Sequence, residues 1–129
     1  MKRTGFTLVE ILIVVIILGI LAAIVIPQFT DASTEAKESN ITSNLQSFRA
    51  QLELYRLQHD GSYPTAANLV TNMTTLVGGY GPYLLQFPVN PFNNLATVDS
   101  TTKGGGNAGW YYNETTGEFT PDDDAHSSL

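Results

Sequence analysis

The sequence GFTLVEILIVVIILGILAAIVIPQF, residues 5–29, is the most apolar stretch of the chain and constrains how everything else can fold. Between residues 6 and 26 only Thr7 and Glu10 carry polar side chains. A helix over this run would be roughly 30 Å long, which matches the hydrocarbon thickness of a bilayer. The sequence therefore predicts one membrane-spanning helix near the N-terminus.

Charged residues flank this apolar segment unequally. Lys2 and Arg3 precede it, whereas the first charged residues after it, Asp31 and Glu35, are acidic. Because positive charge tends to stay on the cytoplasmic side, we expect a single-pass chain with a cytoplasmic N-terminus and an external body. The apolar run continues beyond its small residues, so it matches a cleaved secretory signal poorly.

Glu10 is the residue that a plain membrane anchor leaves unexplained. A carboxylate within a membrane segment costs on the order of a few kcal/mol even on lenient insertion scales. Glu10 follows Phe6 by one helical turn, so both lie on the same face. If the chain were cut between Gly5 and Phe6, the new α-amino group could pair with a glutamate carboxylate, in the same chain or in a neighbour.

These residues resemble the N-terminus of the type IV pilin and pseudopilin superfamily. The resemblance covers a basic leader that ends in Gly5, Phe6 as the new first residue, Glu10 and the apolar helix. It implies that prepilin peptidase removes the leader and that Phe6 becomes N-methylated. It also implies a homopolymer in which Glu10 meets the Phe6 amine of an adjacent subunit, as the N-terminal helices leave the membrane and stack.

Gly19 and Pro27 mark a weak part of this helix. Proline cannot donate a backbone hydrogen bond, and glycine lowers helix stability by roughly 1 kcal/mol relative to alanine. The segment between them is therefore expected to bend or unwind, and in the family it often stretches or melts inside the filament. A simple kink at the membrane boundary is the alternative.

An amphipathic helical pattern follows Pro27. Apolar residues recur at steps of four and three, which is typical of a helix with one buried face. They are Ile41, Leu45, Phe48, Leu52 and Tyr55. The two segments together predict one helix of roughly 50 residues, about 75 Å long, that ends near Gly61. Its first half has no partner within the chain, so it must lie in lipid or against other copies.

The C-terminal half predicts short elements. Thr65 can cap a short helix that carries Leu69, Met73 and Leu76. Strands are expected around residues 95–98, 109–113 and 118–120, the last two as a hairpin with a turn at ETTG. Residues 122–129 are expected to form an acidic, poorly ordered tail.

These elements predict an α+β, pilin-like fold, with one long N-terminal helix packed on a small antiparallel sheet of about three strands. The chain divides into a leader at residues 1–5, an apolar membrane and filament-core segment at 6–29, and a globular domain at 30–129. That domain includes the second half of the long helix.

Three downstream segments resemble a particular branch of the superfamily. They are GSYPT at 61–65, GPYLLQFPVNPF at 81–92 and GWYYNETTGEF at 109–119. All three are similar to the major pseudopilins, the type II secretion protein G branch. The resemblance implies a pseudopilin that polymerises from the inner membrane to move exported protein. Its partners would be minor pilins or pseudopilins and an inner-membrane assembly platform, with a separate cytoplasmic ATPase.

Two other functions are compatible with parts of the sequence. A true type IV pilin, forming surface fibres for adhesion, motility or DNA uptake, would have the same N-terminus. A monomeric membrane-anchored binding domain would also account for the apolar segment. That third function predicts that Glu10 is replaceable, whereas a polymer subunit predicts that it is not.

Calcium is the one cofactor that the resemblance suggests, because major pseudopilins commonly bind it in a loop of the sheet region. Oxygen ligands of the kind that calcium prefers are present. The candidates are Asp99, Asn107, Asp122, Asp123 and Asp124. The loop STTKGGGN at 100–107 lacks acidic residues, and a solvated acidic tail is the alternative interpretation.

Composition and motifs argue against several other classes. The formal charge of −6 disfavours direct binding of nucleic acid. There are no cysteines, so a disulfide cannot close the domain. His59 and His126 are isolated, and no nucleophile or phosphate-binding motif accompanies them, so we expect no enzymatic activity. Aromatic residues along the helix indicate packing and not electron conduction.

Overall fold

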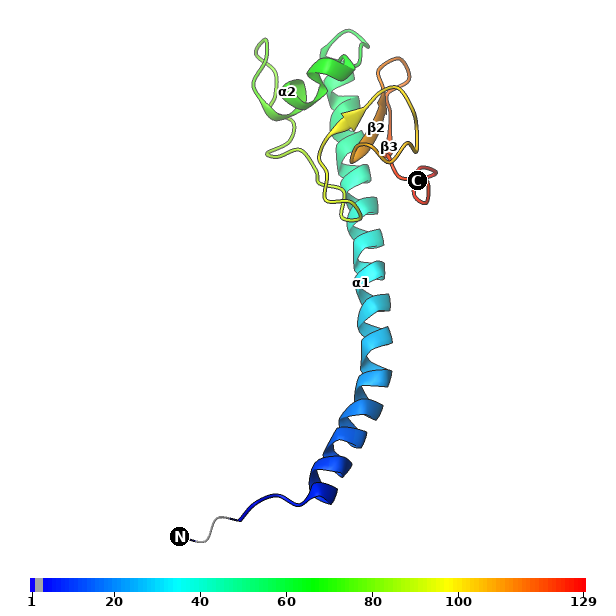
Figure 1. The fold of residues 1–129 in the computed structure, drawn as a ribbon. Coiled ribbons are helices and arrows are strands. Elements are labelled where there is room, and N and C mark those ends of the chain that lie inside the picture. The colour runs from blue at the N-terminus through cyan, green and yellow to red at the C-terminus, as the bar shows by residue number, and fades with distance from the viewer. Residues whose placement is uncertain (2–3) are drawn as a thin grey trace. The chain divides into compact units, whose positions relative to one another are not determined.

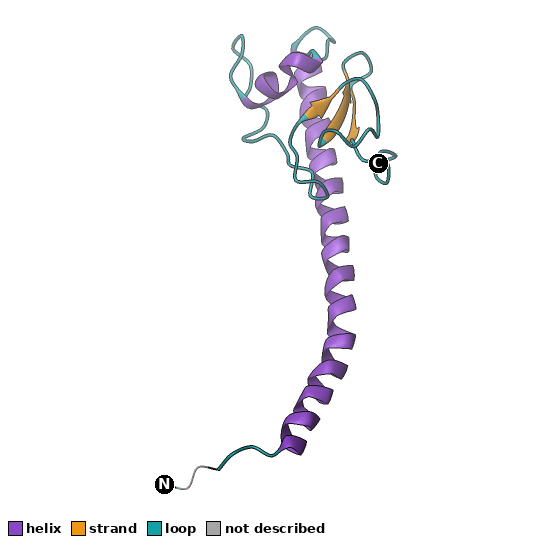
Figure 2. Ribbon diagram, in the orientation of Figure 1, coloured by secondary structure: helices purple, strands orange, loops and turns teal. Residues whose placement is uncertain are grey.

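The computed structural model describes residue 1 and residues 4–129 (Figure 1). Lys2 and Arg3, from which the membrane orientation was predicted, lie outside the described residues. The elements are helix α1, Leu8–Gln58; a 3-10 turn, Ala66–Asn68; helix α2, Leu69–Thr74; and strands β1, Val98–Asp99, β2, Trp110–Asn113, and β3, Glu118–Pro121 (Figure 2). Contacts divide the chain into two compact units, residues 1–36 and 37–129.

Helix α1 confirms the predicted long helix, with 51 residues. It ends where the sequence indicated, because the Gly61 N–H donates to the Arg56 carbonyl over 2.9 Å and closes the last turn. Its first part is long and apolar enough to cross a membrane, and none of those side chains is buried.

The first unit consists mainly of the N-terminal part of α1. The helix runs through Gly19 and Pro27 without a break. One turn after Pro27 the Thr30 hydroxyl donates to the Ile26 carbonyl over 3.2 Å. The isolated chain therefore has no unwound segment here, and bending or melting between Gly19 and Pro27 within an assembly stays a prediction.

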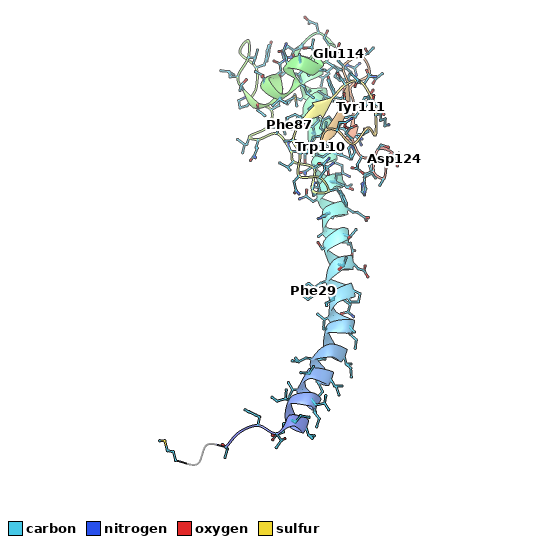
Figure 3. All side chains as sticks on the ribbon, viewed as in Figure 1. Phe29, Phe87, Trp110, Tyr111, Glu114 and Asp124 are labelled. Carbon is cyan, nitrogen blue, oxygen red and sulfur yellow. The ribbon has the colours of Figure 1, made fainter. Side chains whose placement is uncertain are left out.

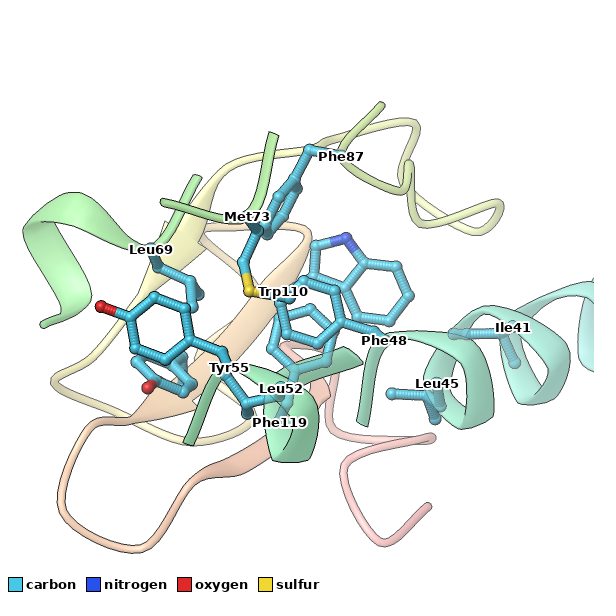
Figure 4. Packing of buried hydrophobic residues seen from close by; sticks show 11 residues of the cluster. Ile41, Leu45, Phe48, Leu52, Tyr55, Leu69, Met73, Phe87, Trp110 and Phe119 are labelled. Carbon is cyan, nitrogen blue, oxygen red and sulfur yellow. The ribbon is translucent and has the colours of Figure 1, made fainter. Parts of the chain in front are cut away.

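The core of the second unit forms around the C-terminal half of α1 (Figure 4). All five residues of the predicted apolar stripe are buried. Phe48 stacks on Phe119 of β3 with ring centroids 3.8 Å apart, and Trp110 of β2 stacks on the same ring at 5.0 Å. Leu69 and Met73, both on the predicted short helix, complete the core from α2. The hydrophobic contacts thus join α1, α2 and the sheet.

The short helix differs from its prediction at both ends. Thr65 makes no capping hydrogen bond through its side chain. Instead the Glu114 carboxylate accepts from the Ala66 N–H over 2.7 Å, so a residue distant in sequence caps the turn. Helix α2 stops at Thr74, and Leu76 is 67% exposed. The Thr75 hydroxyl bonds back to the Thr71 carbonyl, a local contact that competes with continuation of the helix.

The three strands pair in the order β1-β2-β3. Strands β2 and β3 form the predicted antiparallel hairpin. At its turn the Gly117 N–H donates to the Asn113 carbonyl over 2.8 Å. Gly117 has a φ of 73°, and a Cβ there would lie 2.3 Å from the Tyr63 ring. The turn therefore requires glycine for both its conformation and its space.

The prediction of an all-antiparallel sheet is wrong, because β1 runs parallel to β2. Strand β1 contains only Val98 and Asp99, so its ladder is too short to impose a direction. The connection of residues 100–109 returns the chain to the end from which β1 started, so β2 runs in the same direction as β1. The expected strand at 95–98 also shifts, since the Leu95 carbonyl is already bonded to the Asn90 N–H.

Candidate functional site

The start of α1 is organised by Thr7 and Glu10. The Glu10 carboxylate oxygen Oε2 accepts from the Thr7 N–H over 2.7 Å and from the Thr7 hydroxyl over 2.8 Å. In return, the Thr7 hydroxyl accepts from the Glu10 N–H over 3.3 Å. This reciprocal arrangement is a capping box, which satisfies backbone donors that a helix start leaves unpaired.

In the capping box, Thr7 is the local hydrogen-bond partner that fixes the position of the Glu10 carboxylate. A negative charge at this end also interacts favourably with the helix dipole. Both hydrogen bonds fall on Oε2, and within residues 4–129 the structure records no protein donor on Oε1. Thr7 was not among the site residues that the sequence predicted, although the spacing Thr-x-x-Glu before an apolar run is a known signal for this motif.

The backbone at Gly5 and Phe6 precedes the first helical residue. Residues 4–7 have no regular secondary structure and are exposed. Thr4, Gly5, Phe6 and Glu10 line a shallow hollow of about 260 Å³, and the Phe6 side chain is 83% exposed. The bond between Gly5 and Phe6 is thus accessible, and the carboxylate of Glu10 borders the same hollow.

The helix surface after this site is apolar on all sides. From Leu8 to Ile26 every large side chain is exposed, and Val25, at 43%, is the least so. Phe29, just beyond this stretch, projects away from the helix (Figure 3). An exposed apolar surface of this extent marks contact with lipid or with other protein.

The five calcium candidates lie in different surroundings. Asp99 accepts from the Thr101 hydroxyl over 2.6 Å and from the Thr101 N–H over 2.8 Å. These two hydrogen bonds hold the pKa of the Asp99 carboxyl below its ordinary value, and the bond from the Thr101 hydroxyl contributes most. Asn107 and Asp124 are exposed, and Asp123 bonds to His126. In the part of the chain that the structure describes, no three acidic, histidine or cysteine side chains gather in a geometry that could hold a metal.

Asp122 is the exception among the candidates, because it is fully buried. Its carboxylate accepts from the Gly105 N–H over 3.0 Å at Oδ1 and from the Ala108 N–H over 2.9 Å at Oδ2. The structure therefore brings Asp122 against the glycine-rich loop, but as a hydrogen-bond acceptor for backbone.

The prediction of a poorly ordered tail at 122–129 is wrong, although residues 124–125 and 128–129 are exposed as a solvated tail would be. The Arg49 guanidinium donates to the Phe119 carbonyl over 2.8 Å and to the Leu129 carbonyl over 2.9 Å. The His126 ring stacks on Phe92 with centroids 4.0 Å apart. The acidic composition suggested solvation, whereas partners distant in sequence hold this segment against the rest of the second unit.

Comparisons with known proteins find a family match over the part of the chain that contains the start of α1. Residues 1–26 match the family described as the prokaryotic N-terminal methylation motif. Type II secretion system core protein G of Pseudomonas aeruginosa is 34% identical over 100 residues, which cover 72% of this chain and 70% of that protein. The protein of the same name from Vibrio cholerae is 34% identical over 100 residues, covering 72% of this chain and 68% of its own length.

A pilus protein is also similar. The type IV narrow pilus major component PilA5 of Thermus thermophilus is 35% identical over 72 residues, which cover 56% of this chain and 61% of that protein. No solved structure matches this chain.

Proposed function

This chain belongs to the pilin-like family of type II secretion system core protein G, and from that premise we propose how it works. It is a structural subunit of a type IV filament-like assembly, a pseudopilin that polymerises from the inner membrane to move exported protein. One observation carries this proposal: an apolar helical surface that the chain's own residues leave exposed, with a single carboxylate fixed at its start.

Assembly begins with processing at the exposed helix start. Prepilin peptidase cuts after Gly5, and the Phe6 nitrogen changes from an uncharged amide into an amine that is then methylated. The amine of one subunit pairs with Glu10 of its neighbour at Oε1, while Thr7 keeps Oε2 in place. An unpaired charge buried among apolar helices would cost about 3–5 kcal/mol, so the pairing favours subunits that dock in register.

The other partners follow from the same mechanism. The subunit is inserted with its N-terminus in the cytoplasm, and minor pseudopilins and an inner-membrane assembly platform guide its extraction into a periplasmic filament. A separate cytoplasmic ATPase drives the process. We propose no catalytic role for the chain itself, since His59 stacks on Tyr55 and His126 on Phe92 as packing groups. We also propose no direct contact with nucleic acid.

A true type IV pilin is the second candidate function. The similarity to the Thermus thermophilus pilus component, 35% identical over 72 residues, favours it. The greater coverage by the core protein G relatives favours the pseudopilin.

The role of Glu10 is tested by Glu10→Ala and Glu10→Gln in cells that make the complete assembly machinery. Both variants should be cleaved and inserted in the membrane, yet each should give at least tenfold fewer filaments, because both lack the carboxylate charge. Glu10→Gln tests the charge itself, since glutamine keeps the shape of the side chain. Intact-mass analysis checks the cleavage, and electron microscopy of purified filaments measures the yield. Glu35→Ala, an acidic residue of the same helix beyond the apolar segment, is the matched control and should assemble normally. Normal filament yield from Glu10→Ala would refute the assigned role.

A further inference from the structure

The connection between β1 and β2, residues 100–109, has few side chains with which to hold its shape. Gly104 and Gly106 adopt φ values of 74° and 72°, in the left-handed region that favours glycine. A glycine-rich loop loses much conformational entropy when it is ordered, so a fixed loop of this kind needs strong anchors.

Asp122 supplies four of these anchors. Its carboxylate accepts from the Gly105 and Ala108 N–H groups over 3.0 and 2.9 Å. Its own carbonyl accepts from the Gly106 N–H, and its N–H donates to the Gly109 carbonyl over 3.2 Å. At the exposed side of the loop, Lys103 forms an ion pair with Glu118 over 2.6 Å. One buried residue thus bonds to four of the last five residues of the loop.

The same residues do not fit a calcium ion. Calcium takes six to eight oxygen ligands, most of them with lone pairs free to face the ion. Each Asp122 carboxylate oxygen already faces a backbone donor. The Asp99 carboxylate is engaged by Thr101, and Asp123 is engaged by His126. Among the described residues no cluster of acidic or histidine side chains surrounds the loop.

We propose that this loop is independent of metal, and that the buried Asp122 carboxylate fixes the loop in the place where a calcium ion would otherwise act. The negative charge is balanced by directed N–H dipoles, in the way that backbone donors stabilise a bound anion. The folded domain then keeps its stability at any calcium concentration, which separates this chain from a calcium-dependent subunit.

The test uses the full chain in detergent, with the fluorescence of Trp110, the single and fully buried tryptophan, as the probe of unfolding. The wild-type unfolding temperature should be the same in excess EDTA and in millimolar calcium chloride. Asp122→Asn keeps the size but sets an amide donor against a backbone N–H. It should lower the unfolding temperature by roughly 5 °C or more, and calcium should not restore it.

Asp124→Asn is the matched control, because Asp124 is exposed and the substitution removes the same charge. It should shift the unfolding temperature by less than about 2 °C. If Asp122→Asn does not fold, amide hydrogen exchange of the wild type decides. The Gly105 and Ala108 amides should be equally protected in EDTA and in calcium. A higher wild-type unfolding temperature in calcium, or loss of that protection in EDTA, would overturn the proposal.

Discussion

Glu10 and Asp122 are carboxylates that accept hydrogen bonds from backbone N–H groups, and each fixes backbone that has no regular partner. Glu10 does so at the start of α1, through Thr7 three residues away. Asp122 does so from a distance of 14–17 residues along the chain. The first kind of contact can be predicted from spacing, whereas the second depends on the tertiary fold.

This difference explains what could be predicted at the residue scale. Glu10 stands out because its charge interrupts an apolar run. Asp122 is one of three consecutive aspartates, and nothing in their composition distinguishes it. Only the register of β3, which pairs Pro121 with Trp110, decides which aspartate is turned beneath the loop.

Tyr112 gives a prediction about alkaline pH. Burial raises the pKa of its phenol well above the ordinary value of about 10, with a smaller contribution from the Glu114 charge. The unfolded chain releases this proton near pH 10, but the folded chain retains it. The contribution of Tyr112 to the free energy of unfolding is therefore constant below about pH 10, and it falls as the pH rises above 10.

Tyr112→Phe should reduce that alkaline loss of stability. At neutral pH the variant should be about 1 kcal/mol less stable, because the Pro64 carbonyl loses the hydroxyl that donates to it over 2.8 Å. Urea unfolding at several pH values measures both effects. Tyr111→Phe, at a partly exposed neighbour, is the control (Figure 3). Equal pH slopes for the wild type and Tyr112→Phe would contradict the prediction.

At the scale of elements, the long helix and the hairpin were predictable, whereas the ends of the short helix and the rest of the sheet were not. The stripe from Ile41 to Tyr55 repeats at helical spacing, and Gly117 marks the turn between β2 and β3, so local signals suffice. Strand β1 has two residues and pairs through Val98 and Asp99 alone. The loop that Asp122 anchors brings the chain back so that β1 and β2 run parallel. No local sequence pattern encodes these contacts of Asp122.

The buried stripe of α1 should carry most of the stability of the second unit. Phe48 is 1% exposed and contacts the rings of Phe87 and Phe119, so Phe48→Ala should cost about 3–5 kcal/mol. Leu57→Ala, at a residue of the same helix that is 80% exposed, should change stability by less than about 0.5 kcal/mol. Urea unfolding followed by Trp110 fluorescence compares them. A loss below about 1 kcal/mol for Phe48→Ala would contradict this account of the core.

At the scale of the whole molecule, the two units have different requirements. Residues 37–129 bury their own core, whereas the apolar side chains of the first unit remain exposed within the chain. A subunit of this kind is complete only in lipid or among other copies. The sequence predicts this division because the apolar run and the amphipathic stripe follow one another, but it does not distinguish a periplasmic from a surface filament.

Cell fractionation distinguishes these two filaments. We expect a chain that begins at methylated Phe6 in the envelope fraction and little of it in fibres sheared from the cell surface. Intact-mass analysis of both fractions measures the start of the chain and its amount. A processed chain that is abundant in sheared fibres would favour the surface pilus. A chain that still begins at Met1 in both fractions would favour a membrane-anchored domain that does not polymerise.

The contacts of Arg49 join segments of the chain that are synthesised at different times. This side chain on α1 bonds to the Phe119 carbonyl, 70 residues further along the chain, and to Leu129. Because synthesis runs from the N-terminus, residues 41–55 of α1 emerge from the ribosome before β2 and β3, which complete the core around them. Until those strands have been made, the amphipathic stripe from Ile41 to Tyr55 is therefore uncovered. The stripe is covered only once Trp110 and Phe119 have been made, so the second unit completes its core near the end of synthesis.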